Sequence, residues 1–358
     1  MDIFSTSYMM GVVNSYQLDM DNYFLKTFFP SQVSHTTEQI VFDTAEHRHR
    51  IANFIHPDAK APVTEDLGYS TNWVKPAYIK ELRVHTPDRA IKRLAGEPIT
   101  GTMSPEQRSK INMNIALKDA MRMVERRKEK MAFDACLNAK VEIKGKGFDT
   151  EVDFGRSPKL TIELGEKNEA EGWDFSDSLW KKWNHKDGKG KLDADIHTQF
   201  SMLAEHFFNI AKVSPTHIIM RSSTFRHIVL NPSVRELLDF RRGDDSDIYL
   251  GARQSHYGIR YSGRLGEFSV FTYQNEYQNE EGESVQFLND GDVMFLSTEL
   301  QGVRHYGMIH DFGAKLQALP YYADSWTEKN PSKRLFQIQS SPLMVPYRPN
   351  CSMKVKVL

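Results

Sequence analysis

The sequence predicts an α+β fold built around one long helix. A single amphipathic helical pattern runs from about residue 104 to 140, and short runs with alternating apolar residues lie on both sides of it. The chain has 358 residues, which is long enough for two or more compact units with their own cores. Its 46 Lys and Arg residues against 47 Asp and Glu residues give a net charge of −1, which excludes the strongly basic composition typical of nucleic-acid-binding proteins.

The first hundred residues predict an extended segment that needs support from another molecule. Residues 5–16 favour a short helix, the runs at 37–45 and 49–57 predict strand, and 71–84 predicts the strand that returns. Pro76 lacks a backbone N–H group, which favours an edge position for the returning strand. A two-stranded arm is marginally stable in water on its own, so we expect this hairpin to be buried against another subunit.

The long helix has a clear predicted start and one apolar stripe. Ser104 is a predicted N-cap, Pro105 occupies the first helical position, and Gln107 completes a capping box. The charged run at 126–130 is expected to lie on the solvated face. The apolar stripe, which continues to about residue 140, consists of Met113, Leu117, Met121, Val124, Met131 and Ala135.

The rest of the chain returns to a mixture of strands and helices. Three runs between 141 and 164 predict a small sheet beside the long helix, and the polar stretch 165–194 predicts a connection between domains. An amphipathic helix at 196–210 opens the second unit, and we expect the C-terminal strands to return to the first sheet. The other predicted elements are a buried strand at 216–220, helices at about 223–230 and 232–240, and the strands GIRYS, FSVFTY, SVQFL and VMFLS.

No set of residues has the spacing of a known catalytic, cofactor or metal motif, so we expect neither enzymatic activity nor a cofactor. His47 and His49 could ligate a metal, but an Arg- and His-rich contact strand is the simpler interpretation. His305 and the neighbouring His310 and Asp311 could act as acid and base, yet no nucleophile motif accompanies them.

The cysteine count and hydropathy indicate a protein without disulfides or a membrane segment. Cys136 and Cys351 form neither a disulfide framework nor a CxxC pair, which favours a reducing compartment. Cys136 lies near the apolar stripe, where a buried inert thiol is expected. No stretch approaches the roughly 18 apolar residues of a membrane span, and the N-terminus lacks the basic start of a signal peptide.

Six short strings occur in one order along some 320 residues of the chain. They are FLKTFF at 24–29 with TTE at 36–38, WVKP at 73–76, EVDFGRS at 151–157, LDFRRG at 238–243, RHYGMIHD at 304–311 and IQSSPLM at 338–344. In this order and spacing they resemble the lambda-type major capsid protein E family of tailed bacteriophages. None of the strings is an enzyme signature.

This resemblance implies the Hong Kong 97-type phage capsid fold. The N-terminal arm would span 1–36 and the extended E-loop hairpin 37–85. The P domain would span 86–194, with a spine helix at about 104–140, and the A domain would span 195–320. Residues 321–358 would form C-terminal strands that return to the P domain.

The resemblance also implies the function of a major capsid protein of a tailed bacteriophage. Copies would self-assemble into pentamers and hexamers of an icosahedral shell around the double-stranded DNA genome. The implied partners are other copies, a separate scaffolding protein, a portal, a decoration protein and packaged DNA contacted non-specifically, with no membrane. The implied location is the virion capsid, assembled in the host cytoplasm. Two alternatives remain open: an encapsulin-like nanocompartment shell of the same fold, and an α+β hydrolase that uses His305 or His310.

The expected self-assembly contacts lie in the arm, the hairpin and the charged loop after residue 240. Apolar side chains of the arm and hairpin would be buried on neighbouring subunits. In the loop, Arg of one copy could face Asp of the next around a symmetry axis. The expected contact residues are Phe24, Phe28, Phe29, Ile40, Phe42, Arg48, Arg50, Phe54, Trp73, Lys75, Arg241, Arg242, Asp244 and Asp245.

Overall fold

The computed structural model describes most of the chain. The described residues are 5–15, 22–37, 39–45, 69–95, 97, 103–145, 148–165, 167–168, 173–174, 196–231, 234, 248–249, 253–256, 258–265, 268–279 and 281–357. The predicted strand at 49–57, the predicted helix at 232–240 and nearly all of the predicted connection at 165–194 lie outside them.

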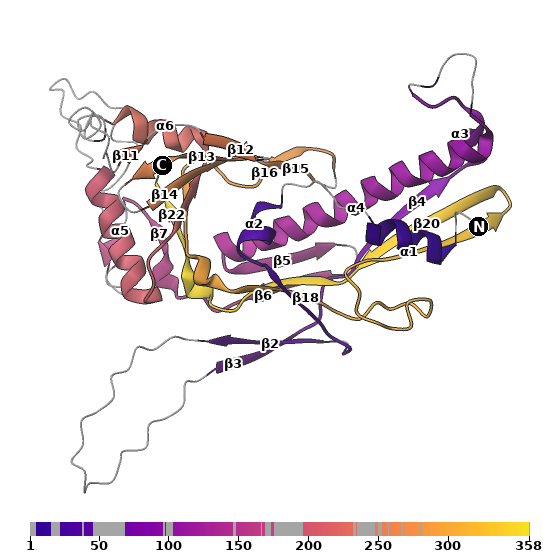
Figure 1. Cartoon of the computed structure of the whole chain (residues 1–358). Coiled ribbons are helices and arrows are strands. Elements are labelled where there is room, and N and C mark those ends of the chain that lie inside the picture. Colours follow the sequence, from indigo (N-terminus) through magenta and orange to yellow (C-terminus); the bar gives the residue numbers. More distant parts are fainter. Residues whose placement is uncertain are drawn as a thin grey trace, which may run out of the picture.

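Helix α4 (Pro105–Leu137) is 33 residues long and runs through the middle of the molecule (Figure 1). Its predicted start is confirmed: Gln107 N–H donates to Ser104 Oγ at 3.2 Å, and Ser104 N–H donates to Gln107 Oε1 at 2.9 Å. Every residue of the predicted apolar stripe is buried. The stripe contacts different partners along its length, and these partners divide the molecule into two cores.

The N-terminal half of α4 packs against a three-stranded sheet. Strands β19 (Tyr322–Lys329), β20 (Ser332–Ser340) and β4 (Ile79–His85) are antiparallel in that order. Their inward side chains share a core with Leu117 and Met121 of α4. Helix α1 (Thr6–Ser15), predicted from residues 5–16, completes this core and lies beside the β19–β20 hairpin (Figure 1).

The C-terminal half of α4 packs against one face of an eight-stranded sheet. Seven of its strands run in the order β11, β13, β14, β10, β17, β22 and β7, and β12 pairs with β13. The alternation of side chains separates two cores: Ile219 and Met294 face α4, whereas Ile218 and Phe295 face helices α5 and α6. The bounds are β7 Thr161–Glu163, α5 Ile196–Ala211, β10 His217–Met220, α6 Ser222–Leu230, β11 Ile248–Tyr249, β12 Arg253–His256, β13 Ile259–Leu265, β14 Phe268–Tyr273, β17 Asp292–Leu296 and β22 Ser352–Lys356.

The C-terminal strands do not all return to one sheet. Strand β20 pairs with β4, whereas β21 (Pro342–Pro346) pairs with β18 (Gly302–Tyr306). Strand β22 lies between β17 and β7 in the large sheet, so it joins a strand of the span 195–320 to a strand of the span 86–194. Strand β7 therefore leaves the small sheet in which the sequence analysis placed it.

The expected returning strand at 71–84 is divided in two. Strand β3 (Tyr69–Val74) pairs with β2 (Ile40–Ala45), and this hairpin extends below the body in Figure 1. The chain then leaves the strand conformation at 75–78 and resumes as β4 in another sheet. Pro76, which cannot donate a ladder hydrogen bond, is buried at this break.

The remaining elements are short and lie around α4. Strands β5 (Lys140–Gly145) and β6 (Phe148–Asp153) form the small antiparallel sheet that follows the helix. The others are α2 Tyr23–Thr27, β1 Ser31–Ser34, α3 Pro87–Ile91, β8 Lys167–Asn168, β9 Trp173–Asp174, β15 Glu276–Gln278 and β16 Ser284–Gln286.

Replacing Gly302 by Ala should weaken the fold where the N-terminal segment meets β18. A Cβ at Gly302 would lie 2.5 Å from Phe28 O and would also overlap the ring of Phe29. Overpacking of this kind costs about 1–3 kcal/mol, so we expect a lower free energy of unfolding in urea. Gly145→Ala is the matched control because a Cβ there meets no atom within 4 Å. Equal stabilities of the two variants would contradict the prediction.

Candidate functional site

A buried carboxylate of α4 anchors the N-terminal segment. The backbone N–H groups of Phe24 and Leu25 donate to Glu129 Oε1 and Oε2 at 2.9 and 3.0 Å. These N–H groups belong to the first turn of α2, where no carbonyl of the helix can accept them. Glu129 is 2% exposed, and burial raises its pKa to about 8. The segment is therefore held by a group that titrates near neutral pH.

A second buried charge of α4 lies next to this carboxylate. Lys128 Nζ lies 3.1 Å from Glu125 Oε1 and 3.7 Å from the centroid of the Tyr321 ring. Asn22 Nδ2 donates to the other oxygen of Glu125 at 2.5 Å. Burial lowers the pKa of Lys128, and the Glu125 carboxylate partly opposes this shift.

These two charges correct the expectation that the run 126–130 lies on a solvated face. Lys128 and Glu129 are 1% and 2% exposed, because the N-terminal segment and the chain around Tyr321 cover this side of α4. The sequence contained a signal for Lys128: it lies four residues after Val124 and three before Met131, in a gap of the apolar stripe.

The aromatic residues of the N-terminal segment form part of the chain's own core. The ring of Phe24 lies 5.2 Å from that of Phe133 and 5.4 Å from that of Tyr273, both in edge-to-face geometry. Phe28 and Phe29 are also buried. We expected these three phenylalanines at contacts between copies, whereas α4 and the strands of the same chain bury them.

A pair of histidines joins the end of β1 to β18. Strand β1 runs parallel to β18, and His35 N–H continues the ladder by donating to Tyr306 O at 2.8 Å. His35 Nε2 lies 2.7 Å from His305 Nδ1, and the rings stack with centroids 4.9 Å apart. Burial lowers both pKa values, and the charge of His35 helps to lower that of His305 to about 4. One ring must donate and the other accept, so the contact requires at least one neutral imidazole.

The β2–β3 hairpin has one buried side and one exposed side. Ile40 and Phe42 point inward, and the ring of Phe42 lies 5.8 Å from that of Phe154. On the opposite side Trp73, which pairs with Val41 in the ladder, is 65% exposed. Lys75 is also exposed. The hairpin is thus attached to the body through its inner side and presents a tryptophan outward.

The match to known proteins agrees with this architecture of arm, long helix and projecting hairpin. The model of the phage major capsid protein E family matches residues 5–357. The chain belongs to that family. The major capsid proteins of Enterobacteria phage P21 and Escherichia phage lambda are 27% and 25% identical to it, each over 350 residues and 96% of both chains. That of Escherichia phage N15 is 24% identical over 362 residues and 100% of both chains.

Solved structures confirm the Hong Kong 97-type fold of this capsid protein. A crystal structure described as a prophage capsid protein of Escherichia coli CFT073 has a TM-score of 0.69 at 20% identity, with 99% of both chains covered. The capsid of cyanophage Pam1 gives a TM-score of 0.50 at 8% identity, with 95% of this chain and 93% of that chain covered.

The family also decides between the alternatives that the sequence left open. It is a family of structural phage proteins, so the prediction of no enzymatic activity is confirmed, and neither the nanocompartment nor the hydrolase is favoured. His305 pairs with His35, while Asp311 accepts a hydrogen bond from Gln339 Nε2 at 2.9 Å. Cys136 is fully buried, and burial raises its pKa well above the usual value, as expected of an inert thiol.

The described part of the capsid protein contains no cluster of three or more His, Cys, Asp or Glu side chains arranged to hold a metal ion. None of its described helices is long and apolar enough to cross a membrane. His47 and His49 lie outside the described residues. The same holds for these residues expected at the assembly contacts: Arg48, Arg50, Phe54, Arg241, Arg242, Asp244 and Asp245.

Glu129→Gln should remove a pH dependence from the stability of the chain. A folded-state pKa of about 8 means that folding takes up a proton between the unfolded pKa near 4.5 and pH 8. The wild type should therefore lose stability relative to Glu129→Gln as pH rises from 5 to 8, by up to about 1.4 kcal/mol per pH unit. Urea unfolding of both proteins at several pH values measures this difference, and a difference that does not change with pH would contradict the prediction.

The histidine pair should make the β1–β18 junction sensitive to acid. Both pKa values are lowered by burial, so the stabilisation is complete above the unfolded pKa of about 6.5 and is lost as pH falls towards 4. Amide exchange of residues 31–35, corrected for the intrinsic rate, should be faster at pH 5 than at pH 7. His35→Gln should reduce this difference, whereas the control His206→Gln should retain it. If amide exchange in His35→Gln is accelerated at pH 5 as much as in the wild type, the histidine pair does not cause the sensitivity to acid.

Proposed function

We propose that this capsid protein assembles with copies of itself into the pentamers and hexamers of a closed icosahedral shell around the double-stranded DNA of a tailed phage. The observation that carries the proposal is the match of the phage major capsid protein E family to residues 5–357. A projecting hairpin whose strands pair only with each other within the described residues is consistent with it, because a two-stranded ribbon gains stability when another surface covers it.

The partners and the place of assembly belong to the same proposal. The shell would form in the host cytoplasm and become part of the virion, with assistance from a separate scaffolding protein, a portal and a decoration protein. Packaged DNA would contact the inner surface without sequence readout. A chain with a net charge of −1 supports this role, since many copies can approach closely without strong mutual repulsion.

The test of the function is the particle that the full-length chain forms. We expect size-exclusion chromatography of the chain, expressed with and without the product of a neighbouring scaffolding gene, to give large species that negative-stain microscopy resolves as rings, sheets or closed shells. A chain that stays monomeric at all concentrations and in both expressions would contradict the proposal.

Trp73→Glu should prevent shell formation without unfolding the chain. The side chain is 65% exposed on the outer side of the hairpin, so it adds little to the chain's own core. A large aromatic residue in this position is typical of the centre of a protein interface, where truncation costs about 2 kcal/mol or more. The thermal midpoint of the unassembled variant should match that of the wild type, and Trp73→Phe should retain assembly. Normal shells formed by Trp73→Glu would show that this side of the hairpin does not take part in the contact between copies.

A further inference from the structure

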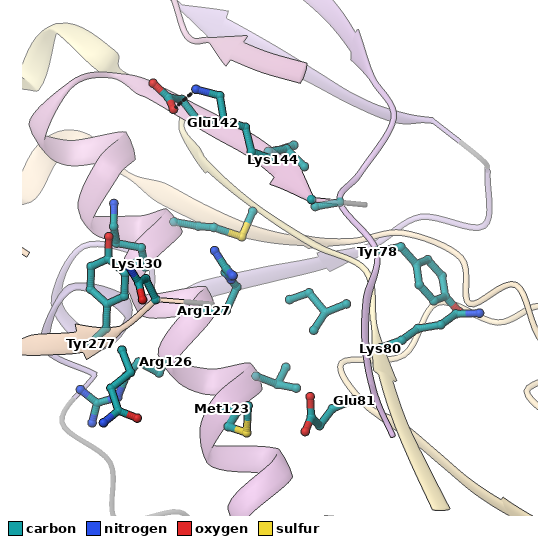
Figure 2. Close-up of a pocket in the computed structure, with 18 of the residues that line it drawn as sticks. Tyr78, Lys80, Glu81, Met123, Arg126, Arg127, Lys130, Glu142, Lys144 and Tyr277 are labelled. Carbon is teal, nitrogen blue, oxygen red and sulfur yellow. Dashed lines mark hydrogen bonds and ion pairs between the residues drawn. The ribbon is translucent and has the colours of Figure 1, made fainter. Parts of the chain in front are cut away.

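The described part of the chain has a large groove along one side of α4, next to the apolar stripe, whose residues Val124 and Met131 also line it. It measures about 1650 Å³ (Figure 2). It is bounded by α4, by β5, by the segment 75–78 with β4, and by the β15–β16 hairpin. Strand β5 directly follows α4, whereas the other two boundaries come from distant parts of the sequence. Lys75, which follows β3, also lines the groove, so the groove reaches the base of the β2–β3 hairpin.

The floor of the groove is partly apolar. Met123, on α4, is 48% exposed, and its sulfur accepts a hydrogen bond from Arg83 Nη2 at 2.9 Å. Ile143 of β5 and Tyr277 of β15 are partly buried against the main core and also line the groove. Methionine is flexible and polarizable, and it is common at surfaces that accept peptide side chains of differing shape.

Three arginines of α4 that form no ion pair within the described residues surround this floor. Arg122 and Arg127 are exposed on α4, and within the described residues neither forms an ion pair. Arg126 donates to Asn275 Oδ1 at 3.3 Å and to Glu276 O at 2.9 Å, and both of these acceptors are neutral.

The acidic residues of the groove are largely neutralised by other groups. Arg83, which does not line the groove, lies 3.1 Å from Glu81 Oε1 and 2.8 Å from Asp119 Oδ2. Lys144 lies 2.7 Å from Glu142 Oε2, a pair that Figure 2 shows on β5. Arg83 carries one charge against two carboxylates, so one of these and Glu276 remain against Arg122, Arg126 and Arg127, and the groove carries a net positive charge.

We propose that this groove binds an acidic, amphipathic segment of a partner protein. Carboxylates of the segment would pair with Arg122, Arg126 and Arg127, and its apolar side chains would cover Met123 and Tyr277. A nucleic-acid phosphate backbone fits less well, because it would meet the arginines but would offer no apolar groups to the floor. The inference goes beyond the proposed shell and does not rest on it.

Synthetic amphipathic peptides test the proposal with the full-length chain. The probes are a fluorescein-labelled 20-residue helical peptide with Leu on one side and Glu on the other, the same peptide with Lys in place of Glu, and a 20-base-pair DNA duplex. Fluorescence anisotropy should show binding of the Glu peptide, and much weaker binding of the Lys peptide. The double variant Arg122→Glu/Arg127→Glu should weaken binding of the Glu peptide at least about tenfold.

Two further variants test the apolar contact and control for a charge change outside the groove. Met123→Gln should also weaken binding of the Glu peptide, because the apolar contact is lost while all arginines remain. Arg226→Glu, an exposed substitution on α6 outside the groove, should leave binding unchanged. Matching circular dichroism spectra and thermal midpoints exclude misfolding of the variants.

Three results would overturn the proposal. The first is equal binding of the Glu and Lys peptides. The second is peptide binding that neither the arginine variants nor Met123→Gln reduces. The third is tight binding of the DNA duplex, lost in Arg122→Glu/Arg127→Glu but unaffected by Met123→Gln, which would identify a phosphate-binding surface instead. Shell formation is measured separately by microscopy, so failure of this proposal and failure of the proposed function are distinguishable.

Discussion

The rest of the structure depends on how two buried ionisable side chains of α4, Glu129 and Lys128, find their partners. A charge or polar group that leaves water is costly unless a partner replaces the lost hydration. Glu129 accepts from two backbone N–H groups of α2, and Lys128 lies between Glu125 and the ring of Tyr321. These partners belong to the N-terminal segment and to the chain before β19. The central helix can therefore be buried on this side only when both segments are in place, which makes the N-terminal segment a part of the subunit core.

Apolar and polar contacts contribute differently to this docking. The cluster around Phe24 and Phe133 buries large aromatic surfaces, but apolar burial has little directional preference and would tolerate a shifted segment. The hydrogen bonds to Glu129 are directional, and a shift of α2 by one residue would place different N–H groups at the carboxylate. The close approach of Phe28 O to Gly302, whose N–H donates to it at 2.9 Å, fixes the same position a second time. The polar contacts thus determine the register of a segment that apolar burial stabilises.

Sequence periodicity predicted the elements whose burial follows from their own pattern. The capping box at Ser104 and the stripe of α4 are local features, and both occur as predicted. The burial of Glu129 depends on a segment 104 and 105 residues away in the sequence, so no local pattern reveals it. The pairing of β22 with both β17 and β7 could not be predicted from local patterns either, because strand order is set by long-range contacts. The family resemblance, in contrast, predicted the fold class directly, since it carries the long-range arrangement that periodicity lacks.

The attachment of the β2–β3 hairpin through side chains has a physical consequence for the proposed assembly. Within the described residues this hairpin forms a sheet of its own, and side chains such as Ile40 and Phe42, rather than backbone ladders, join it to the body. Side-chain contacts can adjust by rotation of packed groups, whereas a change in ladder register would move every side chain to the other face. A chain that occupies several unequal positions in one shell needs contacts that differ while its core stays the same. In the proposed shell, Trp73 on this hairpin would belong to the part that varies, whereas the anchor of the N-terminal segment beside α4 belongs to the core that stays the same.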